Sequence, residues 1–588
     1  MERMSDENLS NIRHSLAHVL ATAVLKYDHE VKIAIGPSTD TGFYYDFEFS
    51  EGKTVGEDNL KKLEKEMRNV LKRGFEPEHK EISVDEAKTI FKDQPYKLEL
   101  IEEIATSGNQ ITTYTIGDFT DLCEGPHVTN SKEIKPDSFS LSHVAGAYWR
   151  GDEKNTMLTR IYGVAFETKE ELEKYIELQE EAKKRDHRKL GKELGLFTFS
   201  DLVGPGLPLF TPKGTAMRRA IVDKISNIQK EYGYEEVTIP HIAKQDLYET
   251  SGHWEKFGDE LFKVTGAHDS TFIMKPMNCP HHTQIYAGYP RSYKDLPIRF
   301  TETTMVYRDE QAGELLGLSR VRSISQDDGH VFCTPEQIIE ESTNIADIIK
   351  QFYTSLGMWG VEGSWVSLSV RDPETPEEYI GDEPQWRLAE DSLESVAKSE
   401  GLTYKRVEGE AAFYGPKLDF MFKDALGRER QLATIQLDLM MPVRFGLEYT
   451  DSNGDKQTPV MIHRAIAGSL ERFMSVIIEH FAGNFPLWLS PVQVSILPIG
   501  DSHFKYAKKI AGILKAQNIR VELDTSAETL GKKIRNVKLS KTPYFLVIGD
   551  EEVTKGEVTL ESRDEGKIGS LTTEALTEKL LKEIAGNI

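Results

Sequence analysis

The chain has 588 residues, of which 39% are hydrophobic and 29% are charged. At roughly 100–200 residues per domain, this length predicts three to five domains. The composition is typical of a soluble globular protein and argues against extended disorder. No run of 18 apolar residues occurs, which excludes a membrane-spanning helix, and the N-terminal segment lacks the pattern of a secretory signal.

The charge and the cysteines narrow the class of protein further. The net charge is −24, and such an acid excess disfavours nucleic-acid binding by the chain as a whole. From Pro491 onward, however, 15 Lys/Arg balance 14 Asp/Glu, so a polyanionic partner is permitted at that end. The cysteines are only three, Cys123, Cys279 and Cys333. An odd, sparse set favours a reducing compartment, so we expect a cytoplasmic protein without a disulfide framework.

The predicted elements define four regions in chain order. Residues 1–165 begin with an amphipathic helix over 8–26 and continue with strands such as 42–47 and 110–114, which indicates an α+β domain. Residues 166–193 are rich in Glu, Lys and Arg with opposite charges spaced i,i+4, and they predict a linker helix. Gly191 and Gly195 are expected to end it.

The third and fourth regions differ in how strands and helices alternate. Residues 194–486 contain predicted helices over 213–232 and 464–482 and predicted strands over 298–307, 411–422 and 430–439, which favours an antiparallel sheet covered by helices. Residues 487–588 alternate predicted strands (493–499, 521–523, 544–549) with predicted helices (502–517, 528–538). This alternation is typical of a largely parallel α/β sheet.

Histidines and a cysteine form the first candidate site. His14 and His18 are spaced i,i+4 on the first helix, and Cys123 and His127 flank a Gly-Pro turn. The four residues are compatible with a Cys/His3 metal site, with a metal-free hydrolytic pocket in which histidines position water, or with unrelated polar positions. Spacing alone leaves these alternatives open.

A second cysteine lies in the segment MKPMNCPHH. Cys279 could join the distant His330 and His463 as a metal ligand, but no spacing rule supports that grouping. A buried cysteine is more often a small core residue.

Two arginine-bearing segments are candidates for phosphate binding. Residues 299–310 and the glycines and arginine after them predict two strands joined by a loop, with Arg308 and Arg320 near the loop. Gly468 and Ser469 open an amphipathic helix that carries Arg472. Arginine binds phosphate oxygens through forked, permanently charged donors, although a surface hairpin and a surface ion pair are the plain alternatives. The sequence contains no P-loop and no dinucleotide-binding glycine motif.

These segments together resemble class II aminoacyl-tRNA synthetases. RFTETTMVYRDEQAG is similar to motif 2 of that class, and HRAIAGSLERF to motif 3. The predicted helix from Gly214 to Gly233, with the predicted strand 237–240 after it, resembles motif 1. MKPMNCPHH, SISQDDGHVF, AAFYGPKLDF and QLATIQLDL narrow the resemblance to the threonyl-tRNA synthetase family, over essentially the whole chain. The resemblance implies an editing domain (1–165), a linker helix (166–193), a class II catalytic domain (194–486) and an anticodon-binding domain (487–588).

The resemblance implies a two-step reaction in which threonine and ATP, with Mg²⁺, give threonyl-adenylate, and the threonyl group then passes to tRNA(Thr). Arg308 would hold the α-phosphate and Arg472 the γ-phosphate, with Lys417 as a further catalytic residue. Cys279, His330 and His463 match the family's ligands for one zinc ion per subunit, which leaves a position open for threonine. The substrate-contacting positions that match are Met277, Arg320, Gln326, Asp328, Tyr414, Gln431 and Gln436.

The same resemblance assigns a role to the first region. Serine lacks only one methyl group of threonine, worth roughly 1–3 kcal/mol, so binding alone discriminates poorly and mischarged Ser-tRNA(Thr) must be hydrolysed. His14, His18, Cys123 and His127, together with Lys97 and Asp121, match that editing pocket, in which the family needs no obligatory metal.

Several expectations concern partners. The resemblance implies a homodimer through motif 1, and Lys533, Arg535 and Asn536 are candidates for anticodon contacts, with a solvated helix face as the alternative. Because His14 lies close to the first residue, the resemblance also implies that the small additional N-terminal domain of many bacterial relatives is missing. The competing hypotheses are a catalytically inactive, synthetase-like RNA-binding protein, a metallohydrolase centred on the first region, and a prolyl or seryl relative.

Overall fold

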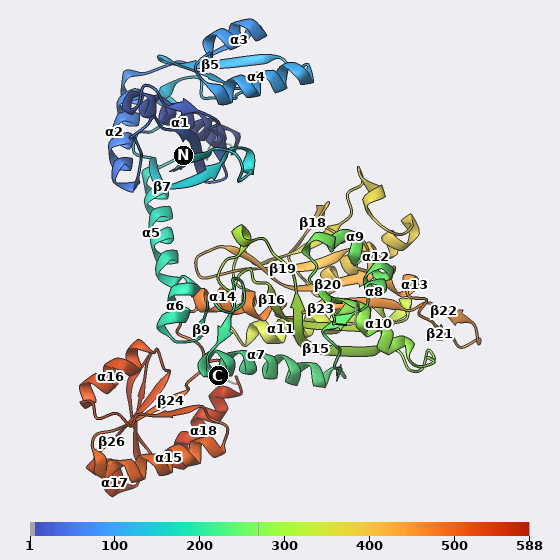
Figure 1. Cartoon of the computed structure of the whole chain (residues 1–588). Coiled ribbons are helices and arrows are strands. Elements are labelled where there is room, and N and C mark those ends of the chain that lie inside the picture. Colours follow the sequence, from blue (N-terminus) through green and yellow to red (C-terminus); the bar gives the residue numbers. More distant parts are fainter. Residues whose placement is uncertain (1–5, 268–269, 587–588) are drawn as a thin grey trace. The chain divides into compact units, whose positions relative to one another are not determined.

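The computed structural model of the chain describes residues 6–267 and 270–586. It divides into two compact units, Met1–Glu180 and Glu181–Ile588 (Figure 1). Among the described residues, no helix is both long and apolar enough to cross a membrane.

The first unit is built from two antiparallel sheets. In the larger sheet, β3 lies between β1 and β8, and β7 forms the far edge. Helices α1 and α2 pack against this sheet, and the apolar face of α1, with Leu16 and Leu20, is fully buried. The bounds are α1 (Asp6–Tyr27), β1 (Lys32–Ile33), β2 (Ser38–Thr39), β3 (Gly42–Glu48), α2 (Glu57–Arg73), β4 (Glu78–Ile82), α3 (Val84–Ile90), α4 (Pro95–Ser107), β5 (Ile111–Ile116), β6 (Phe119–Leu122), β7 (Phe139–Tyr148) and β8 (Met157–Ala165). The α+β character predicted for this region is confirmed.

The predicted linker helix is two helices, α5 (Lys169–Arg185) and α6 (His187–Glu193). The break falls at Asp186, whose backbone leaves the helical region and whose side chain accepts the Arg188 N–H as an N-cap. The expectation that Gly191 ends the helix is wrong, because α6 runs through it; Gly195, with φ of +65°, follows the end.

An eight-stranded sheet forms the centre of the second unit, in the order β11-β15-β16-β23-β20-β19-β17-β18. Neighbouring strands are antiparallel except at the two edges, where β11 joins β15 and β18 joins β17 in parallel. The bounds are β11 (Glu235–Glu236), β15 (Ile298–Tyr307), β16 (Ser323–Cys333), β17 (Trp365–Val370), β18 (Tyr404–Glu408), β19 (Lys417–Lys423), β20 (Glu429–Asp438) and β23 (Val460–Ala465). The predicted antiparallel core is therefore confirmed. The strand predicted at 237–240 is wrong in its bounds, because the edge strand β11 ends at Glu236.

Helices cover one face of this sheet. Helix α11 packs on β16, β20 and β23, α12 on β17, and α14 on β16, while α7 packs on α11. Their bounds are α7 (Pro212–Glu231), α11 (Ile338–Thr354), α12 (Glu383–Ser399) and α14 (Leu470–His480). Shorter elements complete this part: β9 (Phe197–Thr198), β10 (Leu209–Phe210), β12 (Ile242–Ala243), α8 (Gln245–Ser251), α9 (His253–Phe257), β13 (Lys263–Thr265), β14 (Thr271–Met274), α10 (Cys279–Ala287), α13 (Met441–Arg444), β21 (Tyr449–Thr450) and β22 (Lys456–Gln457).

Two predicted elements begin later than expected. The helix predicted over 464–482 starts only at Leu470, because residues 460–465 pair as strand β23 and Ser469 caps the helix by accepting the Arg472 N–H. The strand predicted over 411–422 starts at Lys417, because Ala412 and Gly415 close a tight turn before it.

The last hundred residues form a five-stranded sheet in the order β25-β24-β26-β27-β28. Only β25, β24 and β26 run parallel, while β27 and β28 add antiparallel strands that the prediction of a largely parallel sheet missed. The bounds are β24 (Val494–Pro498), α15 (Phe504–Ala516), β25 (Val521–Leu523), α16 (Leu530–Leu539), β26 (Tyr544–Ile548), α17 (Asp550–Lys555), β27 (Val558–Ser562), β28 (Gly566–Leu571) and α18 (Thr573–Ile584).

Candidate functional site

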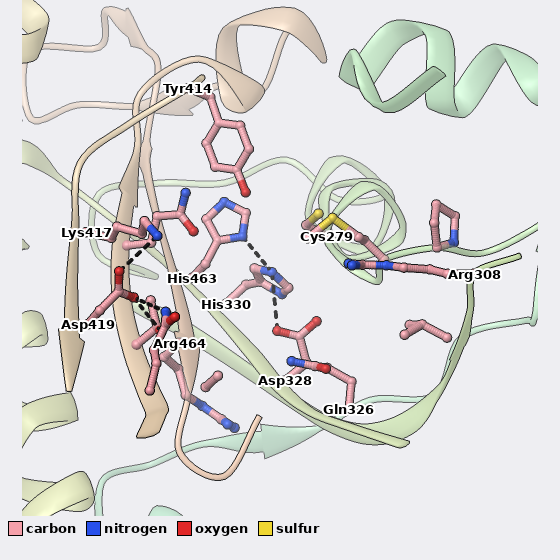
Figure 2. Close-up of a pocket in the computed structure, with 17 residues that line it drawn as sticks. Cys279, Arg308, Gln326, Asp328, His330, Tyr414, Lys417, Asp419, His463 and Arg464 are labelled. Atoms are coloured by element: carbon pink, nitrogen blue, oxygen red, sulfur yellow. Dashed lines mark hydrogen bonds and ion pairs between the residues drawn. The ribbon is translucent and has the colours of Figure 1, made fainter. Parts of the chain in front are cut away.

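One row of polar side chains crosses four neighbouring strands of the eight-stranded sheet. The register pairs Lys417 of β19 with Gln436 of β20, Gln436 with His463 of β23, and His463 with His330 of β16. Directly paired residues project from the same face of a sheet. Four residues that are up to 133 positions apart in the chain are thereby brought to one face. Figure 2 shows Lys417, His463 and His330 of this row.

The alternation of strand β16 separates site residues from core residues. Gln326, Asp328 and His330 line a cavity, whereas Val331 and Cys333 pack into the helix-covered core. This is the period-two pattern expected of a strand with two different faces.

Cys279 comes to this row from outside the sheet, at the first residue of α10. Its Sγ and one nitrogen each of His330 and His463 lie within 4.8 Å of one another (Figure 2). Nε2 of His330 is 3.0 Å from Nδ1 of His463. We call these three residues the Cys/His cluster; the structure thus brings together a grouping for which spacing gave no support.

Contacts with residues outside the Cys/His cluster orient both of its histidines. Nε2 of His463 is 2.9 Å from Oδ2 of Asp438, whose other oxygen accepts the Met440 and Met441 N–H groups. A carboxylate can only accept here, so His463 Nε2 carries the proton and Nδ1 presents a lone pair to the cluster. Nδ1 of His330 contacts Nδ1 of His282 at 2.7 Å. Such support is typical of metal-ligating histidines.

Burial disfavours the charged forms of the side chains in and around the Cys/His cluster. It raises the pKa of the Cys279 thiol well above its ordinary value and lowers the pKa of His330 well below its own. Burial also raises the pKa of Asp328. Neutral imidazoles are the form that binds metal, and a thiolate at this depth needs a cation beside it. The donor set of one sulfur and two imidazole nitrogens therefore fits a zinc ion with an open position.

The cluster lines a cavity of about 470 Å³, which we call the first cavity. Among the predicted residues, its lining includes Met277, Cys279, Arg308, Gln326, Asp328, His330, Tyr414, Lys417, Gln431, Gln436 and His463. Lys417 Nζ is 2.9 Å from Oδ2 of Asp419, and Gln431 donates to Oδ1 of the same carboxylate. Buried Nε of Arg308 has no hydrogen-bond partner within residues 6–267 and 270–586, so this guanidinium retains an unused donor at the cavity wall.

A second cavity, also of about 470 Å³, shares Val306, Arg308, Gln326, Gln431 and other wall residues with the first. Its remaining lining includes Glu310, Arg320, Ser469 and Arg472. Of the residues predicted to bind substrate, Arg320 lies here and not in the first cavity, and its Nε donates to Glu310 at 2.7 Å. The first cavity, which contains the Cys/His cluster, therefore adjoins a second cavity lined by Arg308, Arg320 and Arg472.

A second cluster lies in the first unit, where the structure brings His14, His18, Cys123 and His127 together. Cys123 Sγ is 3.3 Å from Nε2 of His14 and 3.2 Å from Nε2 of His127. We call these four residues the N-terminal cluster. Burial lowers the pKa of His127 to about 2 and raises that of Cys123 to about 12, so both groups are neutral near pH 7.

A buried ion pair borders the N-terminal cluster. Lys97 Nζ is 2.5 Å from Oδ1 of Asp121, and both side chains are almost fully buried. Tyr45 donates to Oδ2 of Asp121 at 2.6 Å, and Nε2 of His18 lies 3.5 Å from the same oxygen. The pocket thus combines neutral nitrogen and sulfur groups with one fixed charge pair.

The predicted RNA contacts on α16 need a correction. Lys533 is only 3% exposed, because its Nζ donates to the Pro498 carbonyl and lies 3.7 Å from Asp524. The expectation that Lys533 meets RNA is therefore wrong. Arg535 and Asn536 are exposed.

Sequence reasoning missed several residues of both sites. His253 contacts Met277 Sδ at 3.0 Å and Cys279 Sγ at 3.8 Å, and Asn278 donates to Asp328. Asp438 and His282 support the Cys/His cluster, and Tyr45 and Ser15 the N-terminal cluster. The sequence signal that could have identified some of them is their position within a recognised motif. Asn278 and His282 lie in MKPMNCPHH, and Asp438 ends the segment QLATIQLD.

Comparisons with known families match three parts of the chain. Residues 262–481 match the tRNA synthetase class II core domain (G, H, P, S and T), and residues 493–583 match an anticodon binding domain. Residues 111–162 match the threonyl and alanyl tRNA synthetase second additional domain.

Similar proteins cover nearly the whole chain. A threonine–tRNA ligase of Gloeobacter violaceus is 48% identical over 99% of this chain and 94% of its own length, and one of Thermus thermophilus is 46% identical over 97% and 88%. The RNA binding domain of threonyl-tRNA synthetase from Cryptosporidium parvum matches with a TM-score of 0.64 at 39% identity, over 68% of this chain and 98% of its own. Giardia lamblia prolyl-tRNA synthetase, at 16% identity over 68% of this chain and 79% of its own with a TM-score of 0.52, shares the fold.

Proposed function

Since the chain belongs to the threonine–tRNA ligase family of class II aminoacyl-tRNA synthetases, we propose that it activates threonine with ATP, transfers threonine to tRNA(Thr) and hydrolyses mischarged Ser-tRNA(Thr). The observation that carries the proposal is the junction of the two cavities. The Cys/His cluster lies in one, Arg472 in the other, and Arg308 in the wall that they share.

Threonine would bind in the first cavity. Cys279, His330 and His463 would hold a zinc ion, which when bound supplies a Lewis-acidic position for the amino and hydroxyl groups of the amino acid. Asp328, held by Asn278 Nδ2 at 3.0 Å and by the Gly329 N–H, would accept the substrate hydroxyl. Valine offers no hydroxyl to this acceptor and leaves it unpaired, which is the kind of mismatch that gives strong rejection.

ATP would extend from the first cavity into the second, accompanied by Mg²⁺. A carboxylate oxygen of threonine attacks the α-phosphorus, the bond from that phosphorus to the bridging oxygen breaks, and pyrophosphate leaves with the electron pair. The guanidinium of Arg308 would stabilise the charge that develops at the α-phosphate, and Arg472 would bind the γ-phosphate. The unused Nε donor of Arg308 supports this assignment.

The transfer step needs the end of tRNA beside the adenylate. A ribose hydroxyl oxygen of the terminal adenosine attacks the threonyl carbonyl carbon. The bond from that carbon to the phosphate oxygen of the adenylate breaks, AMP leaves with the electron pair, and the hydroxyl proton passes to solvent. Arg535 and Asn536, exposed on α16 of the anticodon-type domain, are the remaining candidates for contacts at the other end of the tRNA. We further propose that two chains associate through the region of α7.

Hydrolysis of Ser-tRNA(Thr) would take place in the N-terminal cluster. His14, His18 and His127 are neutral donors or acceptors that could position a water molecule, and the Lys97–Asp121 pair fixes the charge beside them. The second candidate function, an inactive RNA-binding relative, predicts loss of a motif arginine or a zinc ligand. Arg308, Arg472 and all three residues of the Cys/His cluster are present.

The proposal is tested by threonylation of tRNA(Thr) with Asp328→Asn. Loss of the charged acceptor for the substrate hydroxyl is expected to lower kcat/KM for threonine by roughly 10- to 100-fold, in line with about 1.5–3 kcal/mol for a hydrogen bond to a charged group. Asp451→Asn, in an exposed turn where the carboxylate accepts local N–H groups, is the matched control. No threonylation by the unmodified chain would contradict the proposal.

A further inference from the structure

A buried histidine connects the linker helix α6 to the motif 2 hairpin. The hairpin loop, residues 308–322, joins β15 to β16, and its returning arm contains Leu318. Nε2 of His187 accepts the Leu318 N–H at 3.0 Å, and Nδ1 of His187 lies 2.7 Å from Oε1 of Glu479 at the end of α14. His187 is 3% exposed, so these contacts are shielded from water.

The two contacts fix the proton of the ring. A backbone N–H can only donate, so Nε2 is an acceptor and carries no proton. Nδ1 then carries it and donates to Glu479. The ring therefore links α14 to the hairpin loop through one donor and one acceptor, with α6 as its support.

Asp186, His187 and Glu479 lie as close together as a metal-ligand set, but their lone pairs are already used. Both oxygens of Asp186 accept from Arg188, and Glu479 accepts from the backbone N–H of His187 and from Arg428. The Leu318 N–H occupies the only lone pair of the ring that a metal could take. The set is a hydrogen-bonded junction.

The hairpin loop packs tightly against this ring. Gly317 has φ of +51°, and a Cβ placed on it would lie 2.3 Å from Nε2 of His187. Leu318 is fully buried, and Ser319 Oγ is 2.9 Å from Ser475 Oγ of α14. The next residue is Arg320, which lines the second cavity and pairs with Glu310 on the outgoing arm of the loop.

We propose that His187 is a positioning residue for ATP: it anchors the returning arm of the hairpin loop at Leu318, and so holds Arg320 and Glu310 at the wall of the second cavity. This inference rests on the proposed function, in which that cavity takes the phosphates of ATP. The threonine pocket around the Cys/His cluster is not in contact with His187 in any described interaction, so the effect should be specific to ATP.

Two substitutions separate the anchor from the rest of the ring. In His187→Gln the amide oxygen can reach the position of Nε2 and accept the Leu318 N–H. In His187→Asn the shorter amide can replace Nδ1 toward Glu479 but cannot reach Leu318. In threonine-dependent ATP–pyrophosphate exchange we expect His187→Asn to raise KM for ATP about tenfold, the order expected for one lost hydrogen bond. We expect His187→Gln to restore it to within about threefold, with KM for threonine and kcat nearly unchanged in both.

The chain offers a matched control in His503, which is also buried between a backbone donor and a carboxylate. Its Nδ1 accepts the Gly500 N–H at 3.0 Å and its Nε2 is 2.9 Å from Asp550 Oδ1. His503→Asn and His503→Gln are expected to leave KM for ATP unchanged. A wild-type KM for ATP in His187→Asn, or an equal rise in KM for threonine, would overturn the inference.

Hydrogen exchange at the Leu318 amide makes the test independent of catalysis. Exchange of a peptide covering 315–320 should be faster in His187→Asn and near the wild-type rate in His187→Gln; equal rates in both would overturn the anchor. If the unmodified chain shows no exchange of pyrophosphate with any amino acid, the proposed function fails, while the amide measurement still decides the anchor.

Discussion

Asp438 shows how a single residue outside the Cys/His cluster can control it. One oxygen is fixed by two backbone N–H groups, and the other orients His463 and fixes its proton. We expect Asp438→Asn to weaken zinc binding by roughly 10- to 100-fold, as for other substitutions of residues that hydrogen-bond to a metal-ligating histidine. The measurement is zinc retention during titration with a chelator.

Asp424 is the control for Asp438. It is also a buried aspartate that accepts two backbone N–H groups, from Leu426 and Arg428, but it lies outside the cavity lining. Asp424→Asn should lower stability without changing zinc affinity. Equal zinc retention in the two variants would contradict the role given to Asp438.

The N-terminal cluster makes the first unit sensitive to acid. Burial lowers the pKa of His127 to about 2, against about 6.5 in the unfolded chain. The folded state therefore binds fewer protons, so this contribution is fully present above pH 6.5 and is lost as the pH falls below it. Between pH 7.5 and 5.5 the loss is about 1.4 kcal/mol for this residue.

The test for His127 is the free energy of opening of α1, measured by amide hydrogen exchange at both pH values. His127→Gln should reduce the pH dependence by about 1.4 kcal/mol. The exposed His29, changed to Gln, is the control. An unchanged pH dependence in His127→Gln would show that the buried ring is not the origin of the effect.

At the scale of residues, sequence reasoning predicted the site residues that lie in distinctive motifs. It missed residues such as Asp438 that act by orienting another side chain. Cys279, His330 and His463 were grouped by resemblance, because residue spacing does not encode the strand register that aligns the two histidines. Asp438 and His253 had no motif of their own. Lys533 was misjudged because a basic residue on an amphipathic helix can occupy the buried face when a carbonyl and a carboxylate receive it.

At the scale of elements, the turn before β19 depends on one glycine. A Cβ on Gly415 would lie 1.8 Å from the Leu437 carbonyl oxygen, which is backbone of β20 and cannot move without breaking the sheet. Gly415→Ala should therefore displace Tyr414 and Lys417 and lower kcat/KM by about 100-fold, as expected for a shift of about 1 Å at a site. Pyrophosphate exchange measures the effect.

A glycine without such a constraint is the control for this substitution. Gly512 lies inside α15, and a Cβ there meets nothing within 4 Å. Gly512→Ala should raise stability by about 0.5–1 kcal/mol and leave exchange unchanged. Wild-type activity in Gly415→Ala would show that the turn tolerates displacement.

Element boundaries were predictable where one signal dominated. The strand-like segment 298–307, rich in β-branched and aromatic residues, is a strand with the same bounds in the structure. At 464–482 two signals competed, because residues 461–467 are compatible with both a buried strand and the start of a helix. Only the pairing of β23 with two neighbouring strands decides between them. The missed strands β27 and β28 lack long apolar runs. Their place depends on antiparallel pairing, of β27 with β26 and of β28 with β27.

At the scale of the whole molecule, synthesis and editing should be separable by mutation. Every residue of the N-terminal cluster lies in the first unit, and both cavities described for synthesis lie in the second. Cys123→Ala should leave threonine-dependent pyrophosphate exchange unchanged and allow Ser-tRNA(Thr) to accumulate. Deacylation of preformed Ser-tRNA(Thr) measures this, with the exposed Thr106→Ala as control.

Composition distinguishes four regions because each has its own pattern: a helix followed by strands, a charged helix, an antiparallel core and a strand–helix repeat. The two units of the structure are a coarser division, and the break at Asp186 within the linker rests on one capping side chain.

An unchanged level of Ser-tRNA(Thr) in Cys123→Ala would contradict the separation of activities.

In the proposed function, a zinc ion held by the Cys/His cluster selects threonine for activation by ATP. The most direct measurement is zinc content together with ATP–pyrophosphate exchange for threonine, serine and valine, on the wild type and on Cys279→Ala. We predict about one zinc per chain, exchange with threonine, less with serine and almost none with valine, and loss of zinc and exchange in the variant. Zinc-free protein that exchanges with none of the three amino acids would contradict zinc-dependent activation of threonine and favour an inactive RNA-binding relative.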